Sequence, residues 1–162
     1  MSAVIKEAEM SIRPMNEDDL EQVMQIEKRA YDYPWTETIF QDCLRVGYCS
    51  WVMERDNNIV AYGVMSVAVG ESHILNLCVN PELQSHGLGR QLLSHLLEVA
   101  QEHDANMTFL EVRPSNFAAI KLYLGSGFDE IGMRRNYYPA KMGREDALIF
   151  ARTAVRDEDF NE

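Results

Sequence analysis

One segment, Val79 to Arg90, constrains the fold of this chain more than any other stretch. It follows an apolar run typical of a strand, contains Gly87 and Gly89, and opens into a long helix predicted over Leu88 to Glu102. The first N–H groups of a helix have no partners within the helix, and the dipole makes this end positive. Neither glycine carries a Cβ, so an anion can approach the backbone, and Arg90 adds a positive charge. The segment therefore predicts an anion site built on a strand, a loop and a helix.

The spacing alone leaves a second interpretation of this loop open. Glycines in front of a helix also close tight turns where no ligand binds. The loop lacks the Gly-Lys-Ser/Thr ending of a P-loop, and it does not match the Gly-x-Gly-x-x-Gly pattern of dinucleotide-binding folds. At this point, pyrophosphate binding and a simple turn are equal alternatives.

Hydrophobic spacing predicts the order β-α-α-β-β-β-α-β-α-β-β, which indicates an α/β fold with a mixed central sheet. Glu27 is unusual, because this charged residue falls on the apolar stripe of the first helix. The predicted strands span residues 10–13, 48–55, 59–69, 73–79, 107–113, 128–134 and 145–153, with a turn at 56–58. The predicted helices run from a cap at Asn16 to Tyr31, from a cap at Thr36 to Leu44, from Leu88 to Glu102, and from Ala118 to Leu124 after a cap at Asn116.

The length of 162 residues fits one domain, which we expect to span residues 1–154. Residues 155–162 contain four acidic side chains and are expected to form a solvated tail. No apolar run reaches the roughly 18 residues that a membrane-spanning helix needs. Residues 1–7 lack the basic start and apolar run of a signal peptide, so we expect a cytoplasmic location.

The net charge of −11 bears on which kinds of molecule the protein can bind. An acidic surface repels phosphate backbones, so we expect no direct binding of nucleic acid. A basic protein or peptide partner fits the charge, and so does simple solubility. The three cysteines form no Cys-x-x-Cys pair and are expected to be reduced and mostly buried. The four histidines show no metal-ligand spacing, so we expect no metal site.

The loop residues Gln84-x-x-Gly87-x-Gly89 resemble the acyl-CoA signature of the GNAT superfamily of N-acetyltransferases, and the predicted order of elements resembles its fold. Further segments narrow the resemblance: Leu75 to Val79, Leu110 to Tyr123, Gly143 to Ala147, Glu27 to Ala30 with Pro34-Trp35, and Arg134-Arg135-Asn136-Tyr137-Tyr138-Pro139, the most diagnostic of them. On these segments the chain resembles the bacterial RimI family of ribosomal-protein-alanine N-acetyltransferases from about Ile12 to Ala151. The chain departs from the family at Leu124-Gly125-Ser126, where a more helical and often charged spacer is usual.

The resemblance implies that acetyl-CoA is the co-substrate and that no metal takes part. It further implies acetyl transfer to the α-amine of the N-terminal alanine of a small-subunit ribosomal protein, by an enzyme that we expect to be a monomer. Neither a nucleic acid nor a membrane is expected as a direct partner. The implied cofactor contacts are the backbone of Leu77, Cys78 and Val79, the loop residues Gln84, Ser85, His86, Gly87, Leu88, Gly89 and Arg90, and Asn116, which is also a helix cap.

Two residues carry the expected catalytic roles, and each keeps a structural alternative. The family's general base aligns with Glu111, whereas strand spacing alone favours an ion pair between Glu111 and Arg113. The family's general acid aligns with Tyr123. A tyrosine packed between Leu122 and Phe128 is the commoner fate of such a residue.

Four further residues are candidates for the peptide groove. Glu27 either binds the incoming amine or extends along the edge of its helix, and Trp35 is either a contact or a core anchor. Tyr137 and Tyr138 form either a lid over the substrate or part of an edge strand. Two other functions stay open: acetylation of lysine or of a small amine, and a CoA-binding interaction module without catalysis. The presence of both Glu111 and Tyr123 argues against the module.

Overall fold

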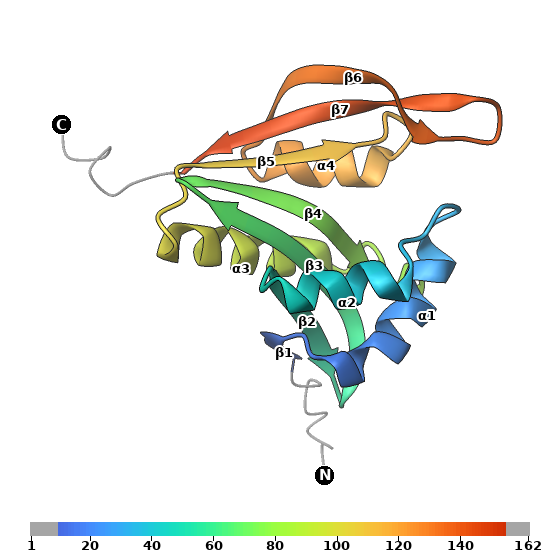
Figure 1. Cartoon of the computed structure of the whole chain (residues 1–162), viewed down its shortest axis with the longest axis vertical. Helices are drawn as coiled ribbons and strands as arrows, with labels where there is room; N and C mark the ends of the chain where they lie inside the picture. The colour runs from blue at the N-terminus through green and yellow to red at the C-terminus, as the bar shows by residue number, and fades with distance from the viewer. Residues whose placement is uncertain (1–9, 155–162) are drawn as a thin grey trace, which may run out of the picture. The chain divides into compact units, whose positions relative to one another are not determined.

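The computed structural model describes residues 10–154 (Figure 1). The expectation of no signal peptide rests on residues 1–7, and that of a solvated tail rests on residues 155–162. Both segments lie outside the described residues. The predicted order of elements is confirmed. The elements are β1 (Met10–Pro14), α1 (Leu20–Ala30), α2 (Glu37–Arg45), β2 (Cys49–Arg55), β3 (Asn58–Ala68), β4 (Glu71–Val79), α3 (Leu88–Glu102), β5 (Met107–Val112), α4 (Phe117–Gly125), β6 (Asp129–Pro139) and β7 (Arg144–Thr153), with short 3₁₀ turns at Glu17–Asp19 and Pro81–Leu83.

The strands follow one another in the sheet in the order β1-β2-β3-β4-β5-β7-β6. Strands β4 and β5 pair in parallel, whereas β1–β2, β5–β7 and β6–β7 pair antiparallel, so the sheet is mixed. The chain divides into two compact units. The first unit contains residues 10–64 and 76–92 of the described chain, and the second contains 65–75 and 93–154. Strands β3 and β4 and helix α3 therefore contribute residues to both units.

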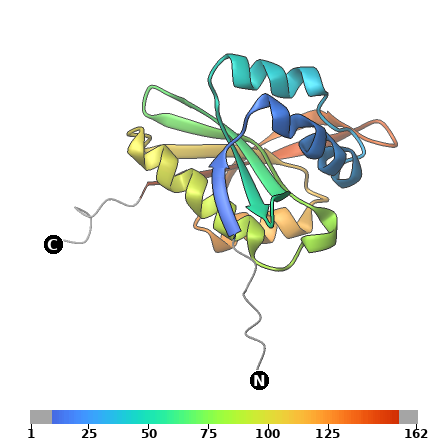
Figure 2. The same cartoon turned by 90° about the horizontal axis from the view of Figure 1, so that it is seen from below.

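In the first unit, helices α1 and α2 contact one another (Figure 2). The cap predicted at Thr36 is confirmed, whereas Asn16 caps the 3₁₀ turn Glu17–Asp19 that precedes α1 and not α1 itself. The side chain of Asn16 accepts a hydrogen bond from the N–H of Asp18 at 2.9 Å, and Asp19 completes a capping box. Thr36 caps α2 through a bond from the N–H of Ile39 at 3.3 Å. Asp19 also binds Arg13 at 2.6 and 2.8 Å, so the start of α1 is joined to strand β1.

Two apolar clusters anchor the helices of this unit to its strands. On one side, the ring of Phe40 in α2 meets the ring of Tyr62 in β3, with 5.8 Å between centroids. The other cluster joins the start of α3 to β2 and β3, and its buried members are Met53, Val60, Ala61, Leu88 and Leu92. Because Leu88 is buried in this cluster, the strands hold the first turn of α3, where the glycine loop ends.

In the second unit, β5 alternates as predicted, because Thr108, Leu110 and Val112 are buried and the residues between them are not. Strand β7 pairs with β5 on one side and with the edge strand β6 on the other. Helix α4 lies beside these strands (Figure 1). The ring centroid of its Tyr123 lies 5.7 Å from that of Phe128, directly before β6, and 6.4 Å from that of Phe150 in β7.

The main difference from the predicted elements is the length of β6. The sequence predicts an end at Arg134, but the strand continues to Pro139, with register shifts between Glu130 and Gly132 and between Arg134 and Tyr138. Pairing with β7 carries the strand past Asn136, whose backbone has a φ of +53°. Local sequence does not show such pairing, because the partner strand lies beyond the hairpin turn.

Between residues 10 and 154, no helix is both long and apolar enough to cross a membrane.

Candidate active site

The glycine loop lies in the first unit. Ser85 and Gly87 have φ angles of +69° and +80°, so the chain turns sharply just before α3 begins at Leu88. A Cβ added at Gly87 would meet no protein atom within 4 Å, which leaves open space in front of the helix start. Positive φ and open space at the N-terminus of a helix are the features of an anion cradle. The exposed side chain of Arg90 supplies a cation one position beyond Gly89.

The end of β4 carries the three residues predicted to contact the cofactor through their backbone. Pairing of β4 with β5 runs from Glu71 opposite Met107 to Ile74 opposite Leu110, and Leu77, Cys78 and Val79 lie beyond this run. The carbonyl of Leu77 accepts a hydrogen bond from the hydroxyl of Tyr31 at 3.3 Å. Burial raises the pKa of the Cys78 thiol to about 11, so this cysteine stays a neutral thiol at physiological pH.

Glu27 is fully buried, with 1% of its surface exposed, so the alternative that it extends along the edge of its helix is wrong. Its carboxylate accepts hydrogen bonds from three separate segments. The hydroxyl of Tyr62 donates at 2.9 Å, the side-chain amide of Asn76 at 2.8 Å, and the backbone N–H of Trp35 at 3.4 Å. These bonds tie α1 to β3, to β4 and to the loop before α2. They explain why a charged residue lies on an apolar stripe.

Trp35 contributes both its backbone and its ring to this part of the first unit. Its N–H binds Glu27, and its ring centroid lies 5.1 Å from that of Phe40. The indole is therefore in contact with the core, although the residue keeps partial exposure.

In the second unit, Glu111 lies near the end of β5 with 15% of its side chain exposed. One carboxylate oxygen, Oε2, is 3.1 Å from Nε2 of His73, and the other, Oε1, is 3.6 Å from Nε of Arg134. The sequence analysis did not identify His73 as a partner of Glu111, because the register between two paired strands cannot be read from a single sequence. His73 and Arg134 are thus two basic side chains close to the carboxylate of Glu111.

Arg113, the alternative partner considered for Glu111, holds the β6–β7 hairpin. Its guanidinium lies 4.4 Å above the ring of Tyr138, and its Nη1 donates to the carbonyl of Pro139 at 2.8 Å. Burial, with a further effect from the charge of Glu111, raises the pKa of Tyr138 to about 12. Tyr138 is therefore neutral at physiological pH and can act as a hydrogen-bond donor.

Tyr137 and Tyr138 both lie in the edge strand β6. Their rings meet edge to face with centroids 4.9 Å apart. The β6–β7 hairpin is also bonded to the loop after β5, because the hydroxyl of Ser115 donates to the carboxylate of Glu145 in β7 at 2.6 Å.

The remaining predicted residues lie on α4 and at its start. The side chain of Asn116 caps the helix by accepting from the N–H of Ala119 at 3.2 Å, as predicted. Tyr123 is 7% exposed and packs against Phe128 and Phe150, so the ring has a structural role whatever its hydroxyl does.

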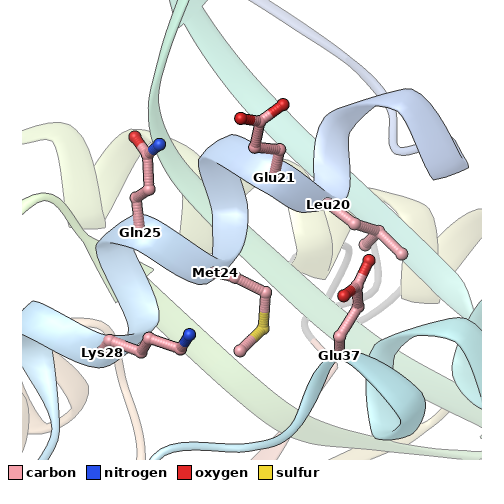
Figure 3. Close-up of a pocket in the computed structure, with 6 residues that line it drawn as sticks. All are labelled: Leu20, Glu21, Met24, Gln25, Lys28 and Glu37. Carbon is pink, nitrogen blue, oxygen red and sulfur yellow. The ribbon is translucent and has the colours of Figure 1, made fainter.

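A separate surface pocket lies along α1 and the start of α2 (Figure 3). It has a volume of about 460 Å³, and its lining residues are Leu20, Glu21, Met24, Gln25, Lys28 and Glu37. None of the predicted catalytic or cofactor-binding residues lines this pocket, so it is distinct from the candidate site. Within residues 10–154, no group of three or more metal-ligating side chains comes together.

Comparison with known proteins supports the family resemblance. The family model described as the acetyltransferase (GNAT) family matches residues 20–128. The [ribosomal protein bS18]-alanine N-acetyltransferase of Escherichia coli (strain K12) is 38% identical over 141 residues, which cover 87% of this chain and 95% of that protein. The corresponding protein of Salmonella typhimurium is 39% identical over the same length. The crystal structure of the ribosomal-protein-S18-alanine N-acetyltransferase from Escherichia coli matches with a TM-score of 0.84 and 36% identity, and covers 92% of this chain and 97% of that one.

We predict that replacing Glu27 by Gln changes how stability depends on pH. Burial raises the pKa of Glu27, and the bonds from Asn76, Tyr62 and Trp35 offset only part of this rise. A raised pKa favours folding below the ordinary value of 4.5, and this contribution is lost as the pH rises through the folded-state value. Gln does not titrate. Urea unfolding should therefore show the wild type losing stability relative to Glu27→Gln as the pH increases above 4.5.

The exposed Glu21 on the same helix provides the control. Its replacement by Gln should change the free energy of unfolding by less than about 0.5 kcal/mol at any pH in this range. A constant difference between wild type and Glu27→Gln across the range would contradict the argument.

Proposed function

Because the chain belongs to the acetyltransferase (GNAT) family, we propose that it transfers acetyl from acetyl-CoA to the N-terminal alanine of a small-subunit ribosomal protein. The observation that carries this proposal is the 38% identity to the bS18-alanine N-acetyltransferase of Escherichia coli over nearly the whole of both chains. The chain is an N-acetyltransferase by family, and its protein substrate is the proposed part.

We propose that acetyl-CoA binds at the glycine loop, at the first turn of α3 and at the end of β4. The N–H groups of the glycine loop and of the first turn of α3 would bind the pyrophosphate, with Arg90 as a nearby cation. The backbone of Leu77, Cys78 and Val79 would pair with the pantetheine arm as an added strand does. The open space at Gly87 supports the first assignment, and the position of Leu77–Val79 beyond the β4–β5 pairing supports the second. Gln84, Ser85, His86 and Asn116 complete the proposed contacts.

The proposed chemistry is direct transfer of the acetyl group to a neutral amine. Glu111 accepts the proton that the amine loses as it attacks the thioester carbon, directly or through water. Tyr123 donates its phenolic proton to the sulfur as the carbon–sulfur bond breaks. Acetylated amine and CoA thiol are the products. Glu111 then releases its extra proton to solvent, and the Tyr123 phenolate takes up a proton from solvent. A backbone N–H of the β4 end polarises the thioester carbonyl.

The substrate contacts are proposed for Glu27, Trp35, Tyr137 and Tyr138. Glu27 would act on the amine through the loop that contains Trp35, because its carboxylate is buried and accepts a hydrogen bond from the N–H of Trp35. Tyr137 is 43% exposed at the hairpin, so it is available to a peptide.

We place the enzyme in the cytoplasm, as a single domain over residues 1–154 that acts as a monomer. A net charge of −11 suits a basic ribosomal protein as substrate and disfavours direct contact with nucleic acid or an anionic membrane.

The proposed function is tested by intact mass analysis. Peptides from the N-termini of small-subunit ribosomal proteins are incubated with the enzyme and acetyl-CoA. We expect one acetyl group on a free N-terminal alanine and none on the same peptide with a blocked N-terminus and free lysines. Acetylation of the blocked peptide would indicate a lysine acetyltransferase. Binding of acetyl-CoA without acetylation of any amine would indicate an interaction module.

Gly87→Val should weaken the binding of acetyl-CoA at least about tenfold, because the new side chain fills the space where the phosphate approaches. Gly47→Val is the matched control. Both glycines have a φ of +80° and no protein atom near an added Cβ, so both variants carry similar backbone strain. Calorimetry should show lost affinity for the Gly87 variant alone, while both lose stability. Equal affinities in the two variants would remove the loop from the cofactor site.

Glu111→Gln should lower turnover roughly 10²-fold near neutral pH and leave the Kd for acetyl-CoA unchanged. An α-amine deprotonates without help as the pH rises through about 8, so the loss should shrink at higher pH. Steady-state kinetics between neutral and alkaline pH provide the measurement. The same loss at every pH would mean that the carboxylate serves only to hold Arg134 and His73.

Tyr123→Phe should reduce both kcat and kcat/KM by about 10²–10⁴-fold, with the Kd for acetyl-CoA nearly unchanged. Phenylalanine keeps the packing against Phe128 and Phe150, so the variant should fold normally. An acyl donor with a more acidic thiol should recover part of the rate, because its thiolate needs less protonation. Activity near that of the wild type would show that Tyr123 only packs the core.

A further inference from the structure

The contact between His73 and Glu111 joins two neighbouring parallel strands. His73 of β4 is paired in register with Phe109 of β5, and Glu111 lies two residues further along the same face of β5. Nε2 of the imidazole is 3.1 Å from Oε2 of the carboxylate, which is hydrogen-bonding distance. The side chain of Glu111 is 15% exposed and that of His73 is 35% exposed, so the contact is partly shielded from water.

A buried polar pair fixes the register on which this contact depends. Ser72 and Thr108 are opposite one another on β4 and β5, next to His73 and Phe109 in the chain. Their hydroxyl oxygens are 2.6 Å apart, and the two residues are 1% and 5% exposed. A one-residue slip of β4 against β5 would separate these buried hydroxyls, which is costly. The position of His73 relative to Glu111 is therefore set by the sheet and not by a mobile loop.

The second carboxylate oxygen has a different environment. Nε of Arg134 is 3.6 Å from Oε1, which is beyond the usual hydrogen-bonding distance, and the arginine side chain is 57% exposed. The guanidinium also lies 5.6 Å from the ring of Tyr137. Arg134 therefore acts on the carboxylate mainly through its charge, whereas His73 is the close hydrogen-bonding partner.

We propose that His73 is a positioning residue for Glu111, and that it holds Oε2 so that Oε1 is presented to the proton of the substrate amine. The inference deepens the proposed function and rests on the role of Glu111 as the base. A glutamate has three rotatable side-chain bonds, so a fixed donor at one oxygen removes most of its freedom. An imidazole that carries a proton on Nε2 donates to Oε2 at this distance.

The first arm of the test measures kinetics in two variants of His73. Valine suits a strand and removes the donor, whereas the amide nitrogen of glutamine can replace Nε2 as a donor. We expect His73→Val to lower kcat roughly tenfold with an unchanged Kd for acetyl-CoA, because a misplaced base slows chemistry and not cofactor binding. His73→Gln should restore most of the rate. Equal rates for wild type, His73→Val and His73→Gln would overturn the proposal.

The second arm does not depend on activity. Urea unfolding of His73→Val, Glu111→Val and the double variant forms a double-mutant cycle, in which valine at position 111 removes the acceptor and suits a strand. We expect the double variant to lose less stability than the two single losses combined, because each single change already breaks the same contact. In the control cycle, His103→Gln takes the place of His73→Val. His103 directly follows α3, and its Nδ1 lies 2.8 Å from the carbonyl oxygen of Val99. That cycle should be additive.

The outcomes separate the two proposals. Additive losses in the His73–Glu111 cycle would overturn the positioning role, whatever the enzyme acetylates. A wild-type enzyme that acetylates no N-terminal alanine, together with a non-additive cycle, would contradict the proposed function and leave the contact established.

Discussion

The pairing of β4 with β5 is the constraint on which the candidate chemistry depends. It begins with Glu71 opposite Met107, is locked by the buried Ser72–Thr108 pair, and runs to Ile74 opposite Leu110. A parallel pair needs a crossover connection, and here that connection contains the glycine loop and α3. One strand thus leads in sequence from His73, beside the proposed base, through Leu77–Val79 to the loop. The histidine beside the proposed base and the residues proposed to pair with the pantetheine arm therefore belong to the same strand, β4.

A second constraint acts inside the first unit, where the carboxylate of Glu27 is buried among neutral donors. Burying a charge is costly unless hydrogen bonds satisfy it, and Glu27 has three, from Tyr62, Asn76 and Trp35. Removal of any one donor would leave a buried acceptor poorly satisfied. Asn76 lies directly before Leu77, so the same network that holds the loop at Trp35 also fixes the start of the proposed pantetheine strand. Such a network favours one arrangement of three segments at the expense of some stability.

The sequence predicted what depends on local periodicity and capping. Thr36 and Asn116 cap as expected, and Asn16 caps the 3₁₀ turn that leads into α1. The alternation over β5 separates Glu111 from the buried Leu110 and Val112. It did not predict what depends on pairing across the sheet. The end of β6 was placed too early because β7 extends it, and His73 was not recognised because its partner lies 38 residues away. Glu27 shows an intermediate case. Its charge on an apolar stripe marked it as unusual, but only the fold shows that its partners come from three other segments.

The basicity of the substrate amine gives a physical reason why a single carboxylate suffices for the proposed reaction. An α-amine has a pKa of about 7.7–8.0 and a lysine side chain about 10.4, so near pH 7.5 a few tenths of α-amines are neutral against roughly 0.1% of lysines. An enzyme acting on an N-terminus therefore meets a substrate that is already partly deprotonated. Its base needs only to remove the proton that becomes acidic as the nitrogen attacks the thioester. For that step, the orientation of the carboxylate matters more than its strength. A partly shielded glutamate held by a neighbouring strand suits this task, and a lysine acetyltransferase with the same residues would need a further means of deprotonating its substrate.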